Sequence, residues 1–187
     1  FDAAMLVREK GFQAVVAPAQ TSDEAIIAVP ADSPITQVEE LQSGIRIATT
    51  ADPDVRMMSM MMLEPADLNA QNTQIDCRET YVLVAKDLIQ GNADIGFFLA
   101  EAYHDLSGVI RQQLRPLVSS QIRIIHHVLL IGPRLIHRLE DIQQALVSMS
   151  DNSKGEGVLN SLALPGWKAV TQEDMEFMID LMDTLGS

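Results

Sequence analysis

Two arginines, Arg56 and Arg78, stand where they could hold an anion. Each lies within a few residues of the end of a predicted buried strand, at or beside the start of a predicted helix. Unbonded N–H groups at a helix start favour anions, and a guanidinium can grip a carboxylate or phosphate with two parallel hydrogen bonds. The alternative is that the arginines form local ion pairs with Asp52, Asp54 or Glu79. The sequence leaves these two interpretations equally open.

Paired acids are a second candidate for chemistry. Asp52 and Asp54 are two residues apart, immediately before a predicted helix. Carboxylates in such positions cap the free N–H groups of a helix and interact favourably with its dipole, and we prefer this interpretation for Asp54. The Asp52-Pro53 dipeptide is typical of a turn. Neither acid is predicted to act as a catalytic group.

Other residue types indicate neither catalysis nor metal binding. Cys77 is the single cysteine and is expected to be a small core residue. His126 and His127 are adjacent on a predicted strand, so they point to opposite faces and only one of them can face a cleft. The methionines at 57–62 have helical spacing and are predicted to fill a core rather than bind copper. No nucleophile, metal or phosphate-loop motif is present, so we expect no enzyme activity and no cofactor.

Strand and helix signals alternate in the central part of the chain. A strand at 45–49 precedes a helix at 54–64, a strand at 73–77 precedes a helix at 79–90, and a buried strand, "ADIGFFL", follows. This β-α-β-α-β series predicts an α/β fold with a mainly parallel sheet flanked by helices. Sites in such folds lie at the carboxyl ends of strands, where the next helix begins. The turns after the first two strands are therefore the places to expect a ligand.

The flanking segments complete the prediction. "SPITQVEELQSG" is expected to form a helix capped by Thr36 and Glu39, with Gly44 just past its end. A helix or loop is expected from Val109 to Arg115. The remaining predicted elements are a helix at 3–10, strands at 13–17, 24–29 and 122–131, and helices at 100–104, 135–149, 154–162 and from 171.

Composition excludes two classes of partner. The chain has 187 residues, of which 47% are hydrophobic and 21% are charged, as in ordinary globular domains. Its formal net charge of −13 repels nucleic acid and anionic membranes at long range. No segment has the roughly 18 consecutive apolar residues of a membrane span. We therefore expect a soluble protein that does not bind nucleic acid.

The order of these segments resembles the type II periplasmic binding proteins, specifically the phosphonate/phosphate/phosphite group of ABC-transporter receptors. The resemblance runs from about Glu24 to the C-terminus. It is carried by "VPADSPITQVEELQSGIRIATTADPD", "CRETYVLVAKDLIQGNADIGFF", "IGPRL" and "LALPGWKAVTQEDMEFM". It implies two α/β lobes that close on a small anion, delivery of that anion to an ABC transporter permease, and a periplasmic or extracytoplasmic location. The alternative is a sensor or interaction domain with a degenerate cleft.

The resemblance also implies lobe boundaries and a ligand site. The second lobe would span 31–121, and the first would be assembled from 1–30 and 122–187. Residues of the family's anion-binding turn, its G-H-E-T segment and its second crossover correspond to the ligand-binding set expected here: Thr50, Asp52, Asp54, Val55, Arg56, Arg78, Glu79, Thr80 and His127.

Two departures from the family change the expectation. The serine and threonine hydroxyls of the family's D-P-x-S-T-S-G turn are replaced by Val55, Arg56, Met57 and Met58, so we expect either a phosphonate-like ligand or another organic acid. The two β-α units that family members place before the segment starting at Phe1 are not in this sequence. We expect either that such residues precede it or that a homodimer completes the first lobe.

Overall fold

The structure is a computed structural model that describes residues 2–123 and 125–185. Its chain forms two compact units. One is Asp23–Ile122, and the other combines Phe1–Ser22 with Arg123–Ser187. The lobe boundaries expected from the sequence differ from these units chiefly in the strand Ala25–Pro30, which pairs within the first of them.

A five-stranded sheet organises the unit Asp23–Ile122. Its strand order is β4-β3-β5-β2-β6, in which β3, β4 and β5 are parallel, and β2 is antiparallel to both β5 and β6. The three parallel strands therefore end at one edge of the sheet. The strands are β2 (Ala25–Pro30), β3 (Arg46–Thr50), β4 (Gln74–Arg78), β5 (Ile95–Leu99) and β6 (Leu114–Ser119).

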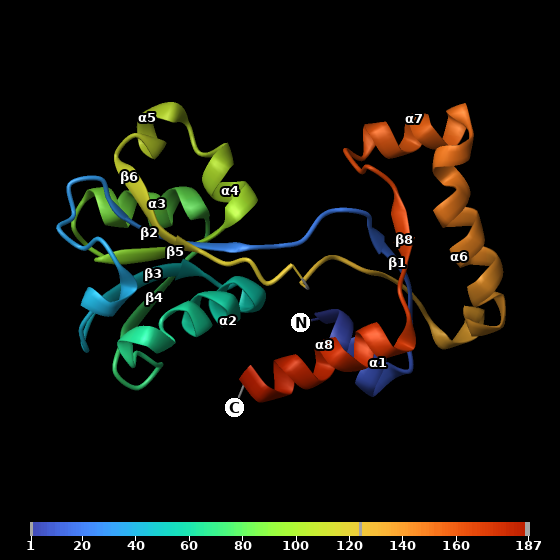
Figure 1. Cartoon of the computed structure of the whole chain (residues 1–187), viewed down its shortest axis with the longest axis horizontal. Helices are drawn as coiled ribbons and strands as arrows, with labels where there is room; N and C mark the ends of the chain where they lie inside the picture. Colours follow the sequence, from blue (N-terminus) through green and yellow to red (C-terminus); the bar gives the residue numbers. More distant parts are fainter. Residues whose placement is uncertain (1, 124, 186–187) are drawn as a thin grey trace. The chain divides into compact units, whose positions relative to one another are not determined.

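Helices follow the parallel strands and cover both faces of this sheet. In Figure 1, α2 (Pro53–Met62) lies on one face, whereas α3 (Tyr81–Ile89), α4 (Ala100–Asp105) and α5 (Gly108–Arg111) lie on the other. Alternate strand residues point to opposite faces, so the nearly continuous apolar runs of the central strands pack against helices on both sides. The α3 side holds a cluster of buried residues: Ile26, Ala28, Ala48, Val84, Ala85, Leu88, Ala93, Phe98, Tyr103, Leu106 and Leu114.

Local signals in the sequence set the ends of α2 and α3. Asp52 accepts hydrogen bonds at the start of α2, and Pro53 occupies the first helical position, where its missing N–H has no cost. Thr80 caps α3 through a bond from the Leu83 N–H. Gly91 follows α3 with φ of +72°, a left-handed conformation that glycine adopts without strain.

A three-stranded sheet organises the other unit. Its order is β7-β1-β8, with β1 antiparallel to both neighbours. One face packs on α1 and α8 through Ala14, Ala17, Val170 and Met175, and the other face packs on α6. The elements are β1 (Gln13–Pro18), β7 (Leu129–Ile131), β8 (Trp167–Ala169), α1 (Asp2–Lys10), α6 (Leu139–Val147), α7 (Ser153–Ser161) and α8 (Gln172–Leu185).

The expected α/β architecture is present. The five-stranded sheet is mixed and the three-stranded sheet is antiparallel, where mainly parallel sheets were predicted. The prediction of a capped helix after Ser33 is wrong, because only a 3-10 turn, Val38–Glu40, forms there. Glu40, rather than Glu39, bonds to Thr36. Further 3-10 turns are Glu64–Ala66, Pro133–Arg138 and Ser148–Asp151.

The predicted strand at 122–131 is also wrong. Only Leu129–Ile131 pairs, with Gln13, Ala14 and Val16 of β1, and Arg123 has a left-handed φ of +56°. Residue 124 of that prediction lies outside the described residues.

Strands β6 and β8 were not expected. Cys77, predicted to be buried, is exposed because β4 is an edge strand. No helix among the described residues is long and apolar enough to cross a membrane.

Glu24 and Ser120 tie together the two chain segments that enter and leave the five-stranded sheet. The Ser120 hydroxyl donates to the Glu24 carboxylate and accepts from the Ala25 N–H at 2.8 Å. The same Glu24 oxygen accepts from the Ile122 N–H at 3.1 Å. Ser120 is 6% exposed, so water cannot easily replace these bonds.

We expect Ser120→Ala to lower the free energy of unfolding by about 1–3 kcal/mol, because it leaves a buried N–H and part of a carboxylate without a partner. Urea denaturation would measure the change. Ser119→Ala, at the neighbouring exposed position, is the matched control and should change stability by less than about 0.5 kcal/mol. Equal effects of the two substitutions would contradict this role for Ser120.

Arg46 and Asp94 join the start of β3 to the start of β5. The Arg46 guanidinium donates to both carboxylate oxygens, at 2.6 and 3.1 Å, and the Arg46 N–H adds a third bond at 2.9 Å. These bonds to Arg46 lower the pKa of Asp94 below its usual value. A carboxylate whose pKa is lower in the folded state stabilises the fold above its unfolded pKa, and this contribution is lost as the pH falls through the folded value.

We therefore expect the stability difference between the wild type and Asp94→Asn to be largest near neutral pH and to shrink below about pH 4. Urea unfolding curves at several pH values would measure it. A difference that is constant between pH 7 and pH 3 would show that the Asp94 charge does not contribute.

Candidate functional site

The two turns expected to hold a ligand lie side by side at the carboxyl edge of the five-stranded sheet. Strands β3 and β4 pair in parallel register, with Thr50 opposite Arg78 as the last pair. The starts of α2 and α3 are therefore neighbours. A side-chain hydrogen bond joins them, because the Tyr81 hydroxyl donates to Asp52 Oδ2 at 3.3 Å. This edge is the candidate site.

Asp52 places a negative charge at the start of α2. Its Oδ1 accepts from the N–H groups of Asp54, at 3.0 Å, and Val55, at 3.2 Å. Its Oδ2 accepts from Tyr81. These N–H groups are the ones that an anion at a helix start would use. An external anion at this edge must therefore rely on other donors or displace Asp52.

Buried hydroxyl groups are the distinctive feature of this edge. Thr50 is 8% exposed, and its Oγ1 has no hydrogen-bond partner among the described residues. Burial raises the pKa of the Tyr81 phenol, whose hydroxyl donates to Asp52, two residues after Thr50. A buried hydroxyl without a partner costs free energy, so Thr50 retains an unused capacity to donate.

Arg78 stabilises the fold through an ion pair with Asp87. Its Nε donates to Asp87 Oδ2 at 2.5 Å, and a nitrogen of the same guanidinium lies 3.9 Å from Asp76. Asp87 is 9% exposed, so its carboxylate depends on this partner. The local ion-pair interpretation therefore describes Arg78, although its partner lies on α3 and is not one of the three acids that the sequence suggested.

Arg56 differs from Arg78. It lies in the first turn of α2, it is exposed, and its side chain forms no ion pair or hydrogen bond with another described residue. The two interpretations offered by the sequence therefore apply to different arginines. Arg78 stabilises the fold, and Arg56 remains available at the edge of the sheet. An exposed guanidinium in the first turn of the helix that follows Thr50 is suited to bind an oxyanion.

The other predicted residues have diverse positions. The Val55 side chain is fully buried, so it belongs to the core, and its N–H already bonds to Asp52. Thr80 caps α3 by accepting from the Leu83 N–H at 3.3 Å, and Glu79 precedes it on the surface. Asp54 lies in the first turn of α2, so the preferred capping interpretation of Asp54 is wrong: Asp52 caps the helix. His127 belongs to the other unit, in the segment before β7, outside any strand.

Sequence reasoning missed Tyr81 and Asp87. Tyr81 directly follows the capping Thr80, and an aromatic residue at a helix start beside a predicted site is a signal that could have been used. Asp87 lies nine residues after Arg78, a separation at which no local rule predicts a pair. Sequence alone could not show that the end of β4 faces the second turn of α3.

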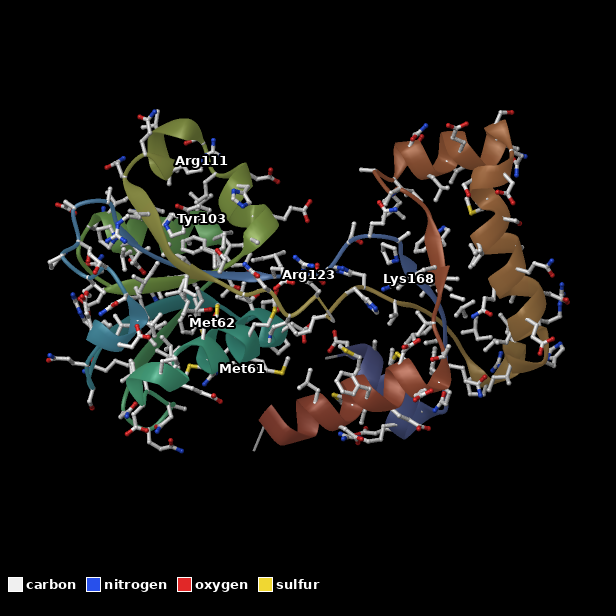
Figure 2. The ribbon with its side chains drawn as sticks, in the orientation of Figure 1. Met61, Met62, Tyr103, Arg111, Arg123 and Lys168 are labelled. Carbon is white, nitrogen blue, oxygen red and sulfur yellow. The ribbon has the colours of Figure 1, made fainter. Side chains whose placement is uncertain are left out.

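Nothing at the edge indicates a metal. Among the residues that the structure describes, no group of three or more His, Cys, Asp or Glu side chains could hold an ion. The methionines of α2 are partly core: Met58 is fully buried, whereas Met61 and Met62, labelled in Figure 2, are half-buried. The candidate site contains the Thr50 and Tyr81 hydroxyls, the Asp52 carboxylate and the Arg56 guanidinium.

Substitution of the two arginines should affect the stability of the protein to different extents. We expect Arg78→Gln to lower the free energy of unfolding by about 1–3 kcal/mol, because it leaves the buried Asp87 charge without its partner. Arg56→Gln should change it by less than about 0.5 kcal/mol. Urea denaturation of both variants measures the difference, and an equally large loss in Arg56→Gln would show that Arg56 is also structural.

Solved structures share this fold. A protein of Xanthomonas citri, XAC2383 bound to chloride ion, matches with a TM-score of 0.76 and 14% identity over 98% of this chain and 75% of that one. PhnD1 from Prochlorococcus marinus in complex with methylphosphonate matches with a TM-score of 0.72 and 8% identity over 97% and 74% of the two chains. Identities this low show the fold alone.

Another structural match is the periplasmic aliphatic sulphonate binding protein SsuA of Escherichia coli, with a TM-score of 0.68, 15% identity, and coverage of 98% of this chain and 67% of that one. Among curated proteins, no match was found. The model of one protein family, described as "ABC transporter, phosphonate, periplasmic substrate-binding protein", matches residues 1–175. The chain therefore belongs to the phosphonate-binding family of periplasmic substrate-binding proteins of ABC transporters, as the sequence resemblance predicted.

Proposed function

We propose that this protein is an extracytoplasmic receptor that captures a small organic oxyanion, of the phosphonate or sulfonate class, and delivers it to the permease of an ABC importer. Membership of the family supports the transport role. The titles of similar structures name methylphosphonate and sulphonate as what those proteins bind. Transfer of that ligand class to this chain is part of the proposal.

The observation that carries the proposal is the unpartnered Thr50 hydroxyl, buried at the sheet edge where α2 and α3 begin. The Tyr81 hydroxyl donates to Asp52, two residues after Thr50, and Arg56 lies in the first turn of α2. In this proposal, Thr50 donates to one oxygen of the ligand and Arg56 binds another. The Asp52 carboxylate orients the Tyr81 hydroxyl by accepting a hydrogen bond from it.

The position of Asp52 restricts the ligand. Its carboxylate already takes two N–H groups of α2, so a dianionic head close to it would be repelled. A monoanion needs fewer donors than a dianion. We therefore place sulfonates and singly ionised phosphonates before free phosphate in the order of expected affinity.

Isothermal titration with ethanesulfonate and methylphosphonate would test the proposal. We expect both to bind the wild type, and Thr50→Val and Arg56→Gln each to weaken binding by about tenfold or more, since a hydrogen bond in which one partner is charged contributes about 1.5–3 kcal/mol. Thr50→Val should leave stability unchanged or slightly raised, because it removes a buried hydroxyl without a partner.

Two controls share the chemistry of these variants. Thr49→Val removes a buried, unpartnered hydroxyl from the preceding position of β3, which faces the other side of the sheet. Lys86→Gln removes an exposed cation from α3. Both should bind like the wild type. Equal losses in Thr49→Val and Thr50→Val would move the site away from this edge.

One observation favours a second candidate, a binding-protein fold that serves as a sensor or interaction domain without a small ligand. The carboxylate of Asp52 already accepts the hydrogen bonds at the start of α2, where an anion would otherwise bind. Absence of heat with every oxyanion tested, in a folded protein, would favour this candidate over the receptor.

A further inference from the structure

A groove of about 670 Å³ lies within the unit Asp23–Ile122. Residues from the end of α2, from strand β6 and from two 3-10 turns line it. The two turns, Val38–Glu40 and Glu64–Ala66, contact each other. None of the lining residues belongs to the candidate site where β3 and β4 end. The groove is therefore a separate feature of the same unit.

Most of the groove lining is apolar. Met61 and Met62, the last two residues of α2, are half-buried, and so is Val118 of β6. Val38 and Pro65, from the two turns, complete the apolar surface. Methionine side chains adapt to apolar partners of different shape and are common at surfaces that bind other proteins. An apolar surface of this kind, partly open to solvent, is typical of a binding site.

The charged residues that line the groove, among those the structure describes, are both acidic. Glu39 and Glu64 are exposed, and neither side chain forms an ion pair or a hydrogen bond with another described residue. Arg115 lies on β6, but its guanidinium donates to the carbonyl oxygens of Ser33 and Ile35. The groove thus has two available carboxylates and no lysine or arginine from the described part of the chain. Its charge complements a cationic partner.

The depth of the groove favours a polypeptide over a small molecule. Val38 is its buried lining residue, and the others are half-buried or exposed. Pockets for small ligands enclose most of the ligand surface, which a shallow groove does not do. An amphipathic helix needs no enclosure, because it lays one apolar face into a groove and keeps its polar face in water. Basic residues beside that apolar face would lie next to Glu39 and Glu64.

We propose that this groove is a docking site for a basic amphipathic helix of another protein. Leucine-like side chains of the helix pack on Met61, Met62 and Val118, and its lysine or arginine side chains pair with Glu39 and Glu64. The apolar contacts supply most of the affinity, and the ion pairs select a cationic partner. The docking site is independent of the proposed ligand site, since the two share no residue.

Methyl NMR of the full chain, labelled with ¹³C at the methionine methyl groups, would test this proposal. Two of the ten methionines line the groove, and the other eight report on the rest of the protein. The probe is a synthetic peptide of leucine and lysine, about 14 residues long, whose leucines recur at helical spacing. We expect saturable shifts of the Met61 and Met62 signals.

A second peptide separates docking from general attraction to an acidic protein. It has the same composition and charge, but leucine and lysine alternate, so it cannot form an amphipathic helix. We expect it to bind at least about tenfold more weakly than the helical peptide. Equal affinity of the two peptides would overturn the proposal.

Variants assign the peptide response to the groove. The double variant Glu39→Gln and Glu64→Gln removes two exposed charges, so it should fold normally and bind the helical peptide about tenfold more weakly. Its matched control is Glu101→Gln with Glu156→Gln, two exposed carboxylates on α4 and α7, which should bind like the wild type. Equal affinity of the two double variants would contradict the docking site.

A second pair of variants tests the apolar contact. Met61→Gln should weaken binding of the helical peptide about tenfold, whereas Met5→Gln, at an exposed methionine of α1, should leave it unchanged. Peptide shifts confined to methionines other than Met61 and Met62 would overturn the proposal. Shifts of these two signals with protein concentration, in the absence of peptide, would overturn it in favour of a second copy of this chain as the occupant.

Discussion

The parallel pairing of β3 with β4 is the constraint on which the candidate site depends. Its register places Thr50 opposite Arg78 at the end of both strands, so two helices that begin 28 residues apart in the sequence start side by side. A shift of one residue would turn every side chain of one strand to the opposite face. The buried apolar residues of β3, Ile47 and Ala48, make such a shift costly. Packing of the core thus fixes the geometry of the sheet edge.

Hydrogen bonds and ion pairs within the protein then decide which groups at that edge are available to a ligand. Asp52 is held by two N–H groups and by Tyr81, and Arg78 is held by Asp87. Both are charged residues that sequence reasoning regarded as candidates for binding, and both are used within the protein itself. Thr50 and Arg56 remain. In the proposed function, one hydroxyl and one guanidinium at this edge would recognise a small anion.

Much of this arrangement could be predicted from the sequence, since the strand-to-helix turns depend on local signals. The β-α alternation predicts both helix starts to within two residues, and the rule about carboxyl ends of parallel strands predicts that they meet. Contacts between segments that are distant in the sequence could not be predicted from these local signals. The Arg78–Asp87 ion pair, the edge position of β4 that exposes Cys77, and the short β7 all depend on which segments become neighbours.

The same division explains the failed predictions. Thr36 and Glu39 have the spacing of a capping box, but the Arg115 guanidinium binds the carbonyl oxygens of Ser33 and Ile35 and holds this segment in a non-helical path. The segment before β7 is apolar enough for a strand, yet it lacks a partner strand among the described residues. In both cases a tertiary contact, or the lack of one, outweighs the local pattern.

The central claim is that an oxyanion binds where β3 and β4 end. Amide NMR of the ¹⁵N-labelled protein during titration with methylphosphonate tests it most directly, because every N–H of both turns reports separately. The account predicts that the largest shifts occur in residues 50–56 and 79–82. Saturable shifts confined to any other part of the chain, with these two turns unchanged, would contradict it.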